Sequence, residues 1–174
     1  IGENKIQELE QKLKNKKPPK ELTIHFIGKL QSNKVKKAVR LCEYIQTVDS
    51  LKLAQKINQQ AQNIFKKQKI YIQVNIGNDE KKSGFTGENK ESYRAISLLK
   101  NIKVLGLMTL LPKTSKEETA LLYKKMKNLQ EKLKKDFFKE CNELSMGMSG
   151  DYHIALEQGA TNIRIGTALY GERK

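Results

Sequence analysis

Short apolar segments alternate with longer amphipathic segments from one end of this 174-residue sequence to the other. Six of the apolar segments have the length and composition of β-strands, and each is followed by a polar loop and a helical pattern. We expect strands over residues 23–28, 44–48, 69–76, 103–109, 143–147 and 162–166. A strand-then-helix order that repeats along a chain is typical of an α/β protein with a parallel sheet.

Local signals predict where some of the helices begin and which faces they bury. Ser50 and Ser115 precede helical patterns and are good capping residues, and Glu118 completes a capping box with Ser115. The helix expected over residues 116–138 carries apolar side chains at intervals of three and four, which indicates packing on one face of a sheet. These side chains are Leu122, Met126, Leu129, Leu133 and Phe137.

The length and composition favour a single domain over residues 1–174, because a chain of this size with 37% apolar residues supports one core. The sequence contains no linker rich in proline, glycine or serine. Six strands are too few to close the common eight-stranded (β/α) barrel. Because the first residue is Ile1 rather than methionine, we expect that a first strand of such a barrel is missing from this chain.

The formal charge of +15 raises the hypothesis of a basic nucleic-acid-binding protein. The lysines are, however, spread over nearly every segment, and aromatic residues make up only 6% of the sequence with no tryptophan. No aromatic residues alternate with a basic stripe, as stacking on bases would require. A lysine-rich hydrated surface is therefore the favoured interpretation.

The sequence also argues against a membrane span and a metal site. No apolar run approaches the roughly 20 residues that a membrane-spanning helix needs, and no segment resembles a signal peptide. Cys42 and Cys141 are the two cysteines, and neither lies in a pattern with metal-ligand spacing. We therefore expect a cytoplasmic protein with free thiols, without a bound metal and without a membrane partner.

Ligands of parallel α/β proteins bind where the strands end, which directs attention to residues 145–151. This segment reads Ser-Met-Gly-Met-Ser-Gly-Asp and precedes a predicted helix. Its two glycines let the backbone approach a ligand closely, and the helix start is suited to an anion such as phosphate. An ordinary glycine-containing turn explains the same residues equally well.

Residues 162–171 form the second candidate segment. The period-two alternation of a strand places Arg164 and Gly166 on the face opposite Ile163. A buried guanidinium is costly without a partner, so Arg164 is expected either in a salt bridge or facing a ligand. Gly166 and Thr167 add backbone N–H donors and a hydroxyl group that suit a phosphate.

Other polar residues near strand ends support no catalytic assignment. His25 lies in a predicted strand, where a lone histidine is more often a core residue than a catalyst. No Ser/His/Asp or Cys/His set is present, so we assign no catalytic residue. Asn75 and the lysines at 81 and 82 are interpreted as parts of a solvated loop.

Several short motifs together resemble one known family, the pyridoxal phosphate homeostasis proteins. The matching segments occur in the same order, cover nearly the whole chain, and are Gly2-Glu3-Asn4, His25-Phe26-Ile27-Gly28, Gln31-Ser32-Asn33-Lys34, Lys82-Ser83-Gly84, Gly106-Leu107-Met108, Leu144-Ser145-Met146-Gly147-Met148-Ser149 and Arg164-Ile165-Gly166-Thr167-Ala168. So many matches in one succession are far more specific than a single glycine motif.

The resemblance implies a (β/α)8 barrel of the alanine racemase N-terminal type, incomplete here, that binds pyridoxal 5′-phosphate (PLP) at the carboxyl ends of its strands. It implies that this cofactor is bound and buffered without robust catalysis, with PLP-dependent apoenzymes as possible recipients and a monomer or weak dimer as the assembly. The residues that it assigns to the cofactor are Ser149, Gly166 and Thr167 at the phosphate, Arg164 at the pyridine nitrogen, and Asn4 and His25 along the ring.

The resemblance also implies that the covalent anchor of the cofactor is a lysine on a strand upstream of Gly2. No lysine of this sequence matches that motif, so we assign no anchoring lysine here, and we leave open whether this chain still binds the cofactor. Two other functions remain as alternatives to the cofactor carrier: a PLP-dependent amino acid racemase and a basic nucleic-acid-binding protein. A racemase needs general bases on both faces of the cofactor, and the sequence offers a site for one face at best.

Overall fold

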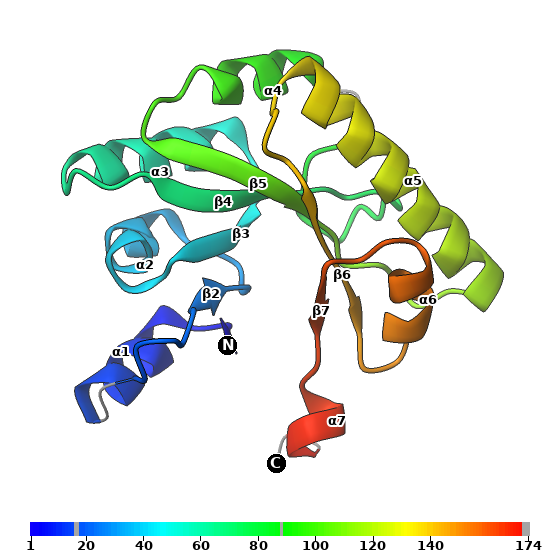
Figure 1. Cartoon of the computed structure of the whole chain (residues 1–174), viewed down its shortest axis with the longest axis horizontal. Helices are drawn as coiled ribbons and strands as arrows, with labels where there is room; N and C mark the ends of the chain where they lie inside the picture. The colour runs from blue at the N-terminus through cyan, green and yellow to red at the C-terminus, as the bar shows by residue number, and fades with distance from the viewer. Residues whose placement is uncertain (16–17, 88, 172–174) are drawn as a thin grey trace.

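The computed structural model describes residues 1–15, 18–87 and 89–171, and its strands form one parallel sheet whose order follows the sequence (Figure 1). The strands are β1 Gly2–Glu3, β2 His25–Phe26, β3 Tyr44–Val48, β4 Gln68–Gln73, β5 Ile102–Met108, β6 Glu143–Met148 and β7 Asn162–Arg164. The helices are α1 Ile6–Asn15, the 3-10 helix η1 Ser32–Lys34, α2 Val35–Leu41, α3 Leu51–Gln62, α4 Lys90–Ser97, α5 Lys116–Asp136, α6 Tyr152–Glu157 and α7 Thr167–Tyr170.

The sheet curls around on itself without closing, which confirms the prediction of an incomplete α/β barrel. Within the described residues, β1 pairs only with β2 and β7 pairs only with β6. Figure 1 shows these two edge strands on either side of an open gap near both chain ends. An eight-stranded barrel would need one more strand at this position.

The prediction of six strands is wrong by one, because β1 forms a seventh. It has only two residues and no apolar run of its own, and it exists through pairing with β2, where Gly2 lies opposite His25. Three predicted strands are also shorter than expected, and the strand predicted over residues 23–28 spans only His25–Phe26. The strand predicted to end at residue 76 ends at Gln73, and the strand predicted to end at residue 166 ends at Arg164 because Gly166 is already the N-cap of α7.

Local capping and amphipathic patterns are confirmed. The Ser50 hydroxyl accepts a hydrogen bond from the backbone N–H of Leu53, and the Ser115 hydroxyl accepts one from that of Glu118. Along α5, Leu122, Met126 and Leu133 are buried against the sheet. Burial of each such side chain contributes about 1.5–3 kcal/mol, so this face holds α5 in place.

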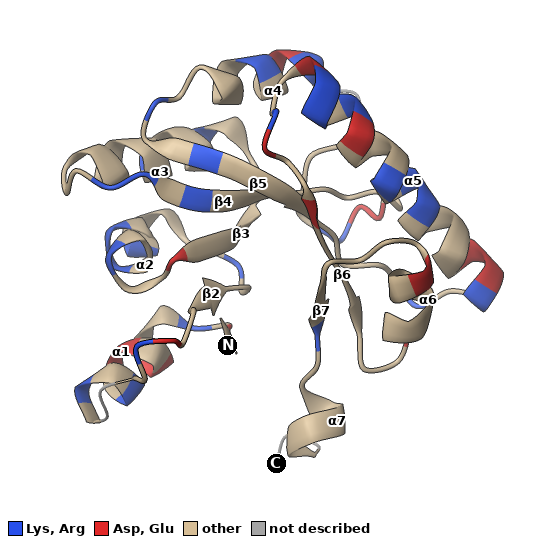
Figure 2. Ribbon diagram, in the orientation of Figure 1, with Lys and Arg blue, Asp and Glu red and all other residues tan. Residues whose placement is uncertain are grey.

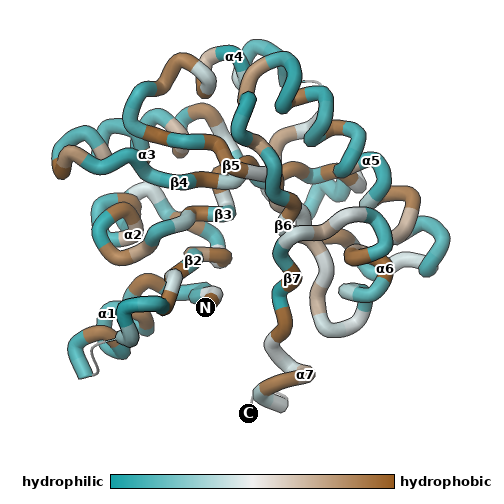
Figure 3. The backbone as a smooth tube through the Cα atoms, in the orientation of Figure 1, coloured by the Kyte–Doolittle hydropathy of each residue, from teal (hydrophilic) through white to brown (hydrophobic). Residues whose placement is uncertain are grey.

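Hydropathy and charge are distributed as a barrel with an outer helical layer requires. Figure 3 shows hydrophobic stretches along the central strands and a mostly hydrophilic α5. Figure 2 shows basic residues spread over α1, α2 and α5 rather than gathered on one element, with acidic residues also on α1 and α5. None of the helices in the described part of the chain is long and apolar enough to cross a membrane.

Candidate functional site

A chain of hydrogen bonds crosses the barrel interior between four strands and the end of a fifth. Arg164 donates from Nη1 to Ser145 Oγ at 2.8 Å and from Nη2 to the Thr109 carbonyl at 2.8 Å. Ser145 Oγ in turn donates to Gln46 Oε1 at 2.6 Å. The Gln46 amide nitrogen lies 2.8 Å from Nδ1 of His25. Two predicted site residues, His25 and Arg164, are therefore connected through Gln46 and Ser145, to which the sequence assigned no role.

The amide of Gln46 determines which nitrogen of His25 carries the proton. An amide nitrogen can only donate, so Nδ1 of His25 accepts and the proton resides on Nε2. The imidazole ring stacks on Tyr44 with the ring centroids 4.2 Å apart and the planes 4° from parallel. Burial lowers the pKa of His25 below its ordinary value, which favours the neutral ring. His25 therefore presents an N–H donor from an oriented, neutral imidazole.

Arg164 brings a positive charge into the barrel without an acidic partner. None of the ion pairs formed by the described residues includes this side chain. Desolvation by burial lowers the pKa of Arg164 from its ordinary value, although Tyr123 and Asp151 act in the opposite direction. Its neutral hydrogen-bond acceptors orient the guanidinium but do not neutralise it, which leaves a site suited to an anion or a strong acceptor.

Ser149, Gly166 and Thr167 meet at the carboxyl ends of β6 and β7. Ser149 Oγ accepts a hydrogen bond from the backbone N–H of Ala168 at 3.4 Å, which joins the loop after β6 to the start of α7. Gly166 and Thr167 are exposed, and no atom lies within 4 Å of the position that a Cβ of Gly166 would occupy. This open space beside two backbone turns is the predicted phosphate position.

Asp151 fixes the loop that carries Ser149. It is the N-cap residue of α6, but its side chain makes no capping bond to that helix. Its Oδ1 accepts from the backbone N–H of Met148 at 2.7 Å, and its Oδ2 accepts from the Tyr123 hydroxyl at 2.8 Å. Gly147 permits the turn with φ of +93°. The Asp151 carboxylate thus ties the loop to α5 through Tyr123 and to the end of β6 through Met148.

Asn4 lies on the far side of the open gap, directly after β1. Its carbonyl oxygen would be 2.0 Å from a Cβ added to Gly28, so only glycine allows the two backbones to approach this closely. The Asn4 side chain is exposed and makes no hydrogen bond with the described residues. The six predicted site residues therefore come from two sides of the barrel, from β1 and β2 on one side and from β6, β7 and the residues after them on the other.

Sequence reasoning missed Gln46 and Thr109, and it included Ser145 in a candidate segment without a role; all three are buried. The available signal was a polar residue inside or directly after a strand that is otherwise apolar. Asn75 was correctly interpreted as a loop residue, because its side chain accepts from the Asp79 N–H at 3.1 Å and donates to the Lys82 carbonyl at 3.2 Å.

A second polar group occupies the barrel interior nearer the amino ends of the strands. The Tyr71 hydroxyl donates to the Glu143 carboxylate, and the Asn162 amide donates to both of them. Burial, followed by this carboxylate, raises the pKa of Tyr71 well above its ordinary value. Because these partners satisfy one another, the group is a structural floor beneath Arg164 and Ser145.

Comparison with known proteins identifies the family. The model of the alanine racemase N-terminal domain family matches residues 1–174. A pyridoxal phosphate homeostasis protein of Synechocystis sp. is 41% identical, with 99% of this chain and 80% of the relative covered. One of Aquifex aeolicus is also 41% identical, with 99% of this chain and 76% of the relative covered.

The solved structures of PipY from Synechococcus elongatus have the same fold. Both PipY chains are 34% identical to this one. Each match covers 98% of this chain and 80% of the PipY chain. The TM-score is 0.93 for PipY without PLP and 0.89 for PipY with PLP bound. This chain belongs to the alanine racemase N-terminal domain family and, within it, to the pyridoxal phosphate homeostasis proteins.

Proposed function

We propose that this chain is a PLP-binding homeostasis protein that carries the cofactor and has no robust catalytic activity. The observation that carries this proposal is the position of the Arg164 guanidinium. It is oriented by Ser145 and Thr109 and has no carboxylate partner among the residues that the structure describes. It lies at the strand ends where the Ser149 loop meets the start of α7. PipY, a member of the same family, has a structure with PLP bound. The residues present therefore suit the cofactor.

Each residue of the proposed site contributes to holding the cofactor. Ser149, Gly166 and Thr167 hold the phosphate through a hydroxyl group and backbone N–H groups. Arg164 donates to the pyridine nitrogen, and because a guanidinium keeps its proton, this nitrogen stays unprotonated. His25 and Asn4 line the ring. When bound, the cofactor supplies an electrophilic aldehyde, and the chain keeps this group oriented and sheltered.

The carrier function is favoured over a racemase by the state of His25. A racemase would need a proton acceptor on each face of the cofactor. The group linked to Arg164 contains one titratable base, His25, whose accepting nitrogen Nδ1 is already used by the amide of Gln46. Its Nε2 carries a proton and can donate but not accept.

We further propose a cytoplasmic location for this function. Cys42 and Cys141 are both buried and free, which suits the reducing cytoplasm. In this compartment the chain, as a monomer or weak dimer, would hold PLP and release it to PLP-dependent apoenzymes.

The test is a comparison of PLP with pyridoxal, which lacks the phosphate, by equilibrium dialysis against the purified chain. We expect PLP to bind at least about tenfold more tightly, because charge-assisted hydrogen bonds to the phosphate contribute about 1.5–3 kcal/mol each. Equal affinity for both compounds, or no binding of either, would refute the assigned site.

A further inference from the structure

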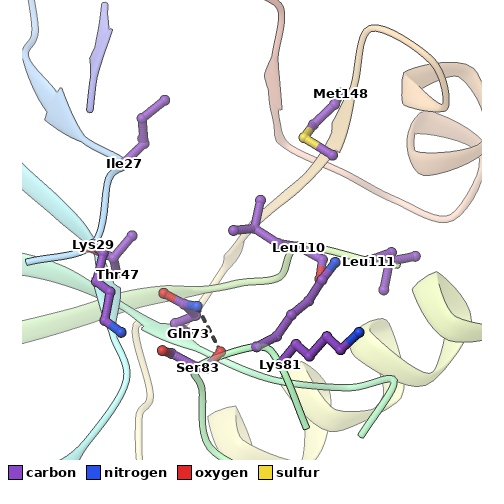
Figure 4. A pocket seen from close by; sticks show the side chains of 10 residues that line it. Ile27, Lys29, Thr47, Gln73, Lys81, Ser83, Leu110, Leu111 and Met148 are labelled. Atoms are coloured by element: carbon purple, nitrogen blue, oxygen red, sulfur yellow. Dashed lines mark hydrogen bonds between the residues drawn. The ribbon is translucent and has the colours of Figure 1, made fainter. Parts of the chain in front are cut away.

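A cavity opens at the barrel mouth next to the proposed cofactor site. It has a volume of about 370 Å³ (Figure 4). Ile27, two residues after His25, and Met148, which precedes Ser149, both line it. The cavity therefore adjoins the cofactor site, but none of the six predicted cofactor residues is part of its wall.

Positive charge gathers in this cavity without neutralisation. Lys29, Lys81 and Lys82 line it, and no aspartate or glutamate does. None of the ion pairs found in the described part of the chain involves these three lysines. The ammonium group of Lys82 donates to the Leu110 carbonyl at 3.1 Å, which leaves two of its three N–H donors for a ligand. Asp79 is close in sequence but is not part of the wall.

The loop that carries two of these lysines is fixed before any ligand arrives. Gln73, at the end of β4, donates from Nε2 to the Ser83 carbonyl at 2.8 Å, as drawn in Figure 4. Asn75 donates to the carbonyls of Asp79 at 2.8 Å and Lys82 at 3.2 Å. A site whose backbone is already ordered loses less conformational entropy on binding.

The rest of the wall is largely apolar. Ile27, Leu110, Leu111 and Met148 contribute aliphatic and thioether surface, and Met148 is 38% exposed. Inorganic anions gain nothing from such surface, whereas an organic anion would bury its carbon atoms against it. We propose that this cavity is a binding site for a small carboxylic acid with an apolar body, whose carboxylate meets Lys82 and Lys81.

This site does not depend on the proposed cofactor function. It uses different side chains, and its occupant is held by lysine ammonium groups rather than by Arg164. Its wall shares none of the six residues assigned to the cofactor.

The experiment is an NMR titration of the purified chain, labelled at the methyl groups of isoleucine, leucine and methionine, without PLP. The probes are 4-methylvalerate, its neutral amide and inorganic phosphate. We expect the acid to shift the methyl signals of Ile27, Leu110, Leu111 and Met148. The acid should also bind at least about tenfold more tightly than the amide. Phosphate should bind more weakly than the acid, because it has no apolar body.

Two variants with the same change of charge make the test specific. Lys82→Gln should weaken the acid about tenfold and leave the amide unchanged, whereas Lys124→Gln, at an exposed position of α5, should change neither. The proposal is overturned if acid and amide bind alike, if phosphate binds as tightly as the acid, if both variants behave alike, or if no methyl signal shifts. PLP affinity, measured on the same samples, should not differ between Lys82→Gln and the parent chain.

Discussion

Ser145 Oγ lies 2.6 Å from Gln46 Oε1, although the two residues are 99 positions apart in the sequence. This contact joins β3 to β6 across the barrel and connects the two sides of the site. It fixes the orientation of the Gln46 amide, which in turn fixes the protonated nitrogen of His25. The same hydroxyl accepts from Arg164, so Ser145 orients both the Gln46 amide and the Arg164 guanidinium.

Replacing Gln46 by leucine should lower the free energy of unfolding by about 1–3 kcal/mol, because Ser145 and His25 would lose buried hydrogen-bond partners. Urea unfolding measures this change. Gln59→Leu is the matched control, since Gln59 is exposed on α3, and it should change stability by less than about 0.5 kcal/mol. If both variants lose the same stability, the connection through Gln46 has no energetic importance.

Protonation of His25 should make the free energy of unfolding decrease as the pH is lowered. Burial lowers its pKa below the ordinary value of about 6.5, so on acidification the unfolded chain takes up the proton before the folded protein does. The free energy of unfolding should therefore fall as the pH drops below about 6.5, and this loss should continue until the folded pKa is reached.

Denaturant unfolding at pH 7.5 and 5.5 measures that dependence. In His25→Gln the fall between the two pH values should be smaller than in the parent chain, because glutamine does not titrate. His153→Gln, which removes an exposed histidine, is the control. An unchanged pH dependence in His25→Gln would show that His25 is not the group responsible.

Gly28→Ala should be severely destabilising, by more than about 2 kcal/mol, because the new Cβ would lie 2.0 Å from the Asn4 carbonyl oxygen. Neither backbone can move away without breaking the pairing of β1 with β2. Gly87→Ala is the control, since no atom lies within 4 Å of its added Cβ. Thermal unfolding of both variants tests the claim, and similar melting temperatures would contradict it.

Arg164→Lys should weaken PLP binding about tenfold while the charge is kept, because lysine cannot donate to Ser145, Thr109 and a ligand in one fixed plane. Fluorescence titration with PLP would show the loss. The unfolding midpoint of the same variant separates this effect from misfolding. An affinity equal to that of the parent chain would mean that the fork geometry of Arg164 is not used by the cofactor.

The sequence predicted features whose causes are local. The caps at Ser50 and Ser115 involve partners only three residues away, and the apolar stripe of α5 follows from helical spacing alone. The strand β1 was missed because two residues carry no periodicity, and only its pairing with β2 makes it a strand. The barrel-crossing contacts of Gln46 were missed for a related reason, since Ser145 is its partner only once the sheet has curled.

The proposed function places the phosphate of PLP between Ser149 and Thr167. The most direct measurement is the affinity of Ser149→Asp for PLP, with Ser97→Asp at the exposed end of α4 as the control of equal charge. We predict that Ser149→Asp binds PLP at least about tenfold more weakly, because a carboxylate would repel the phosphate at close range, and that Ser97→Asp binds like the parent chain. If Ser149→Asp retains the parent affinity, the phosphate lies elsewhere and the assigned site is wrong.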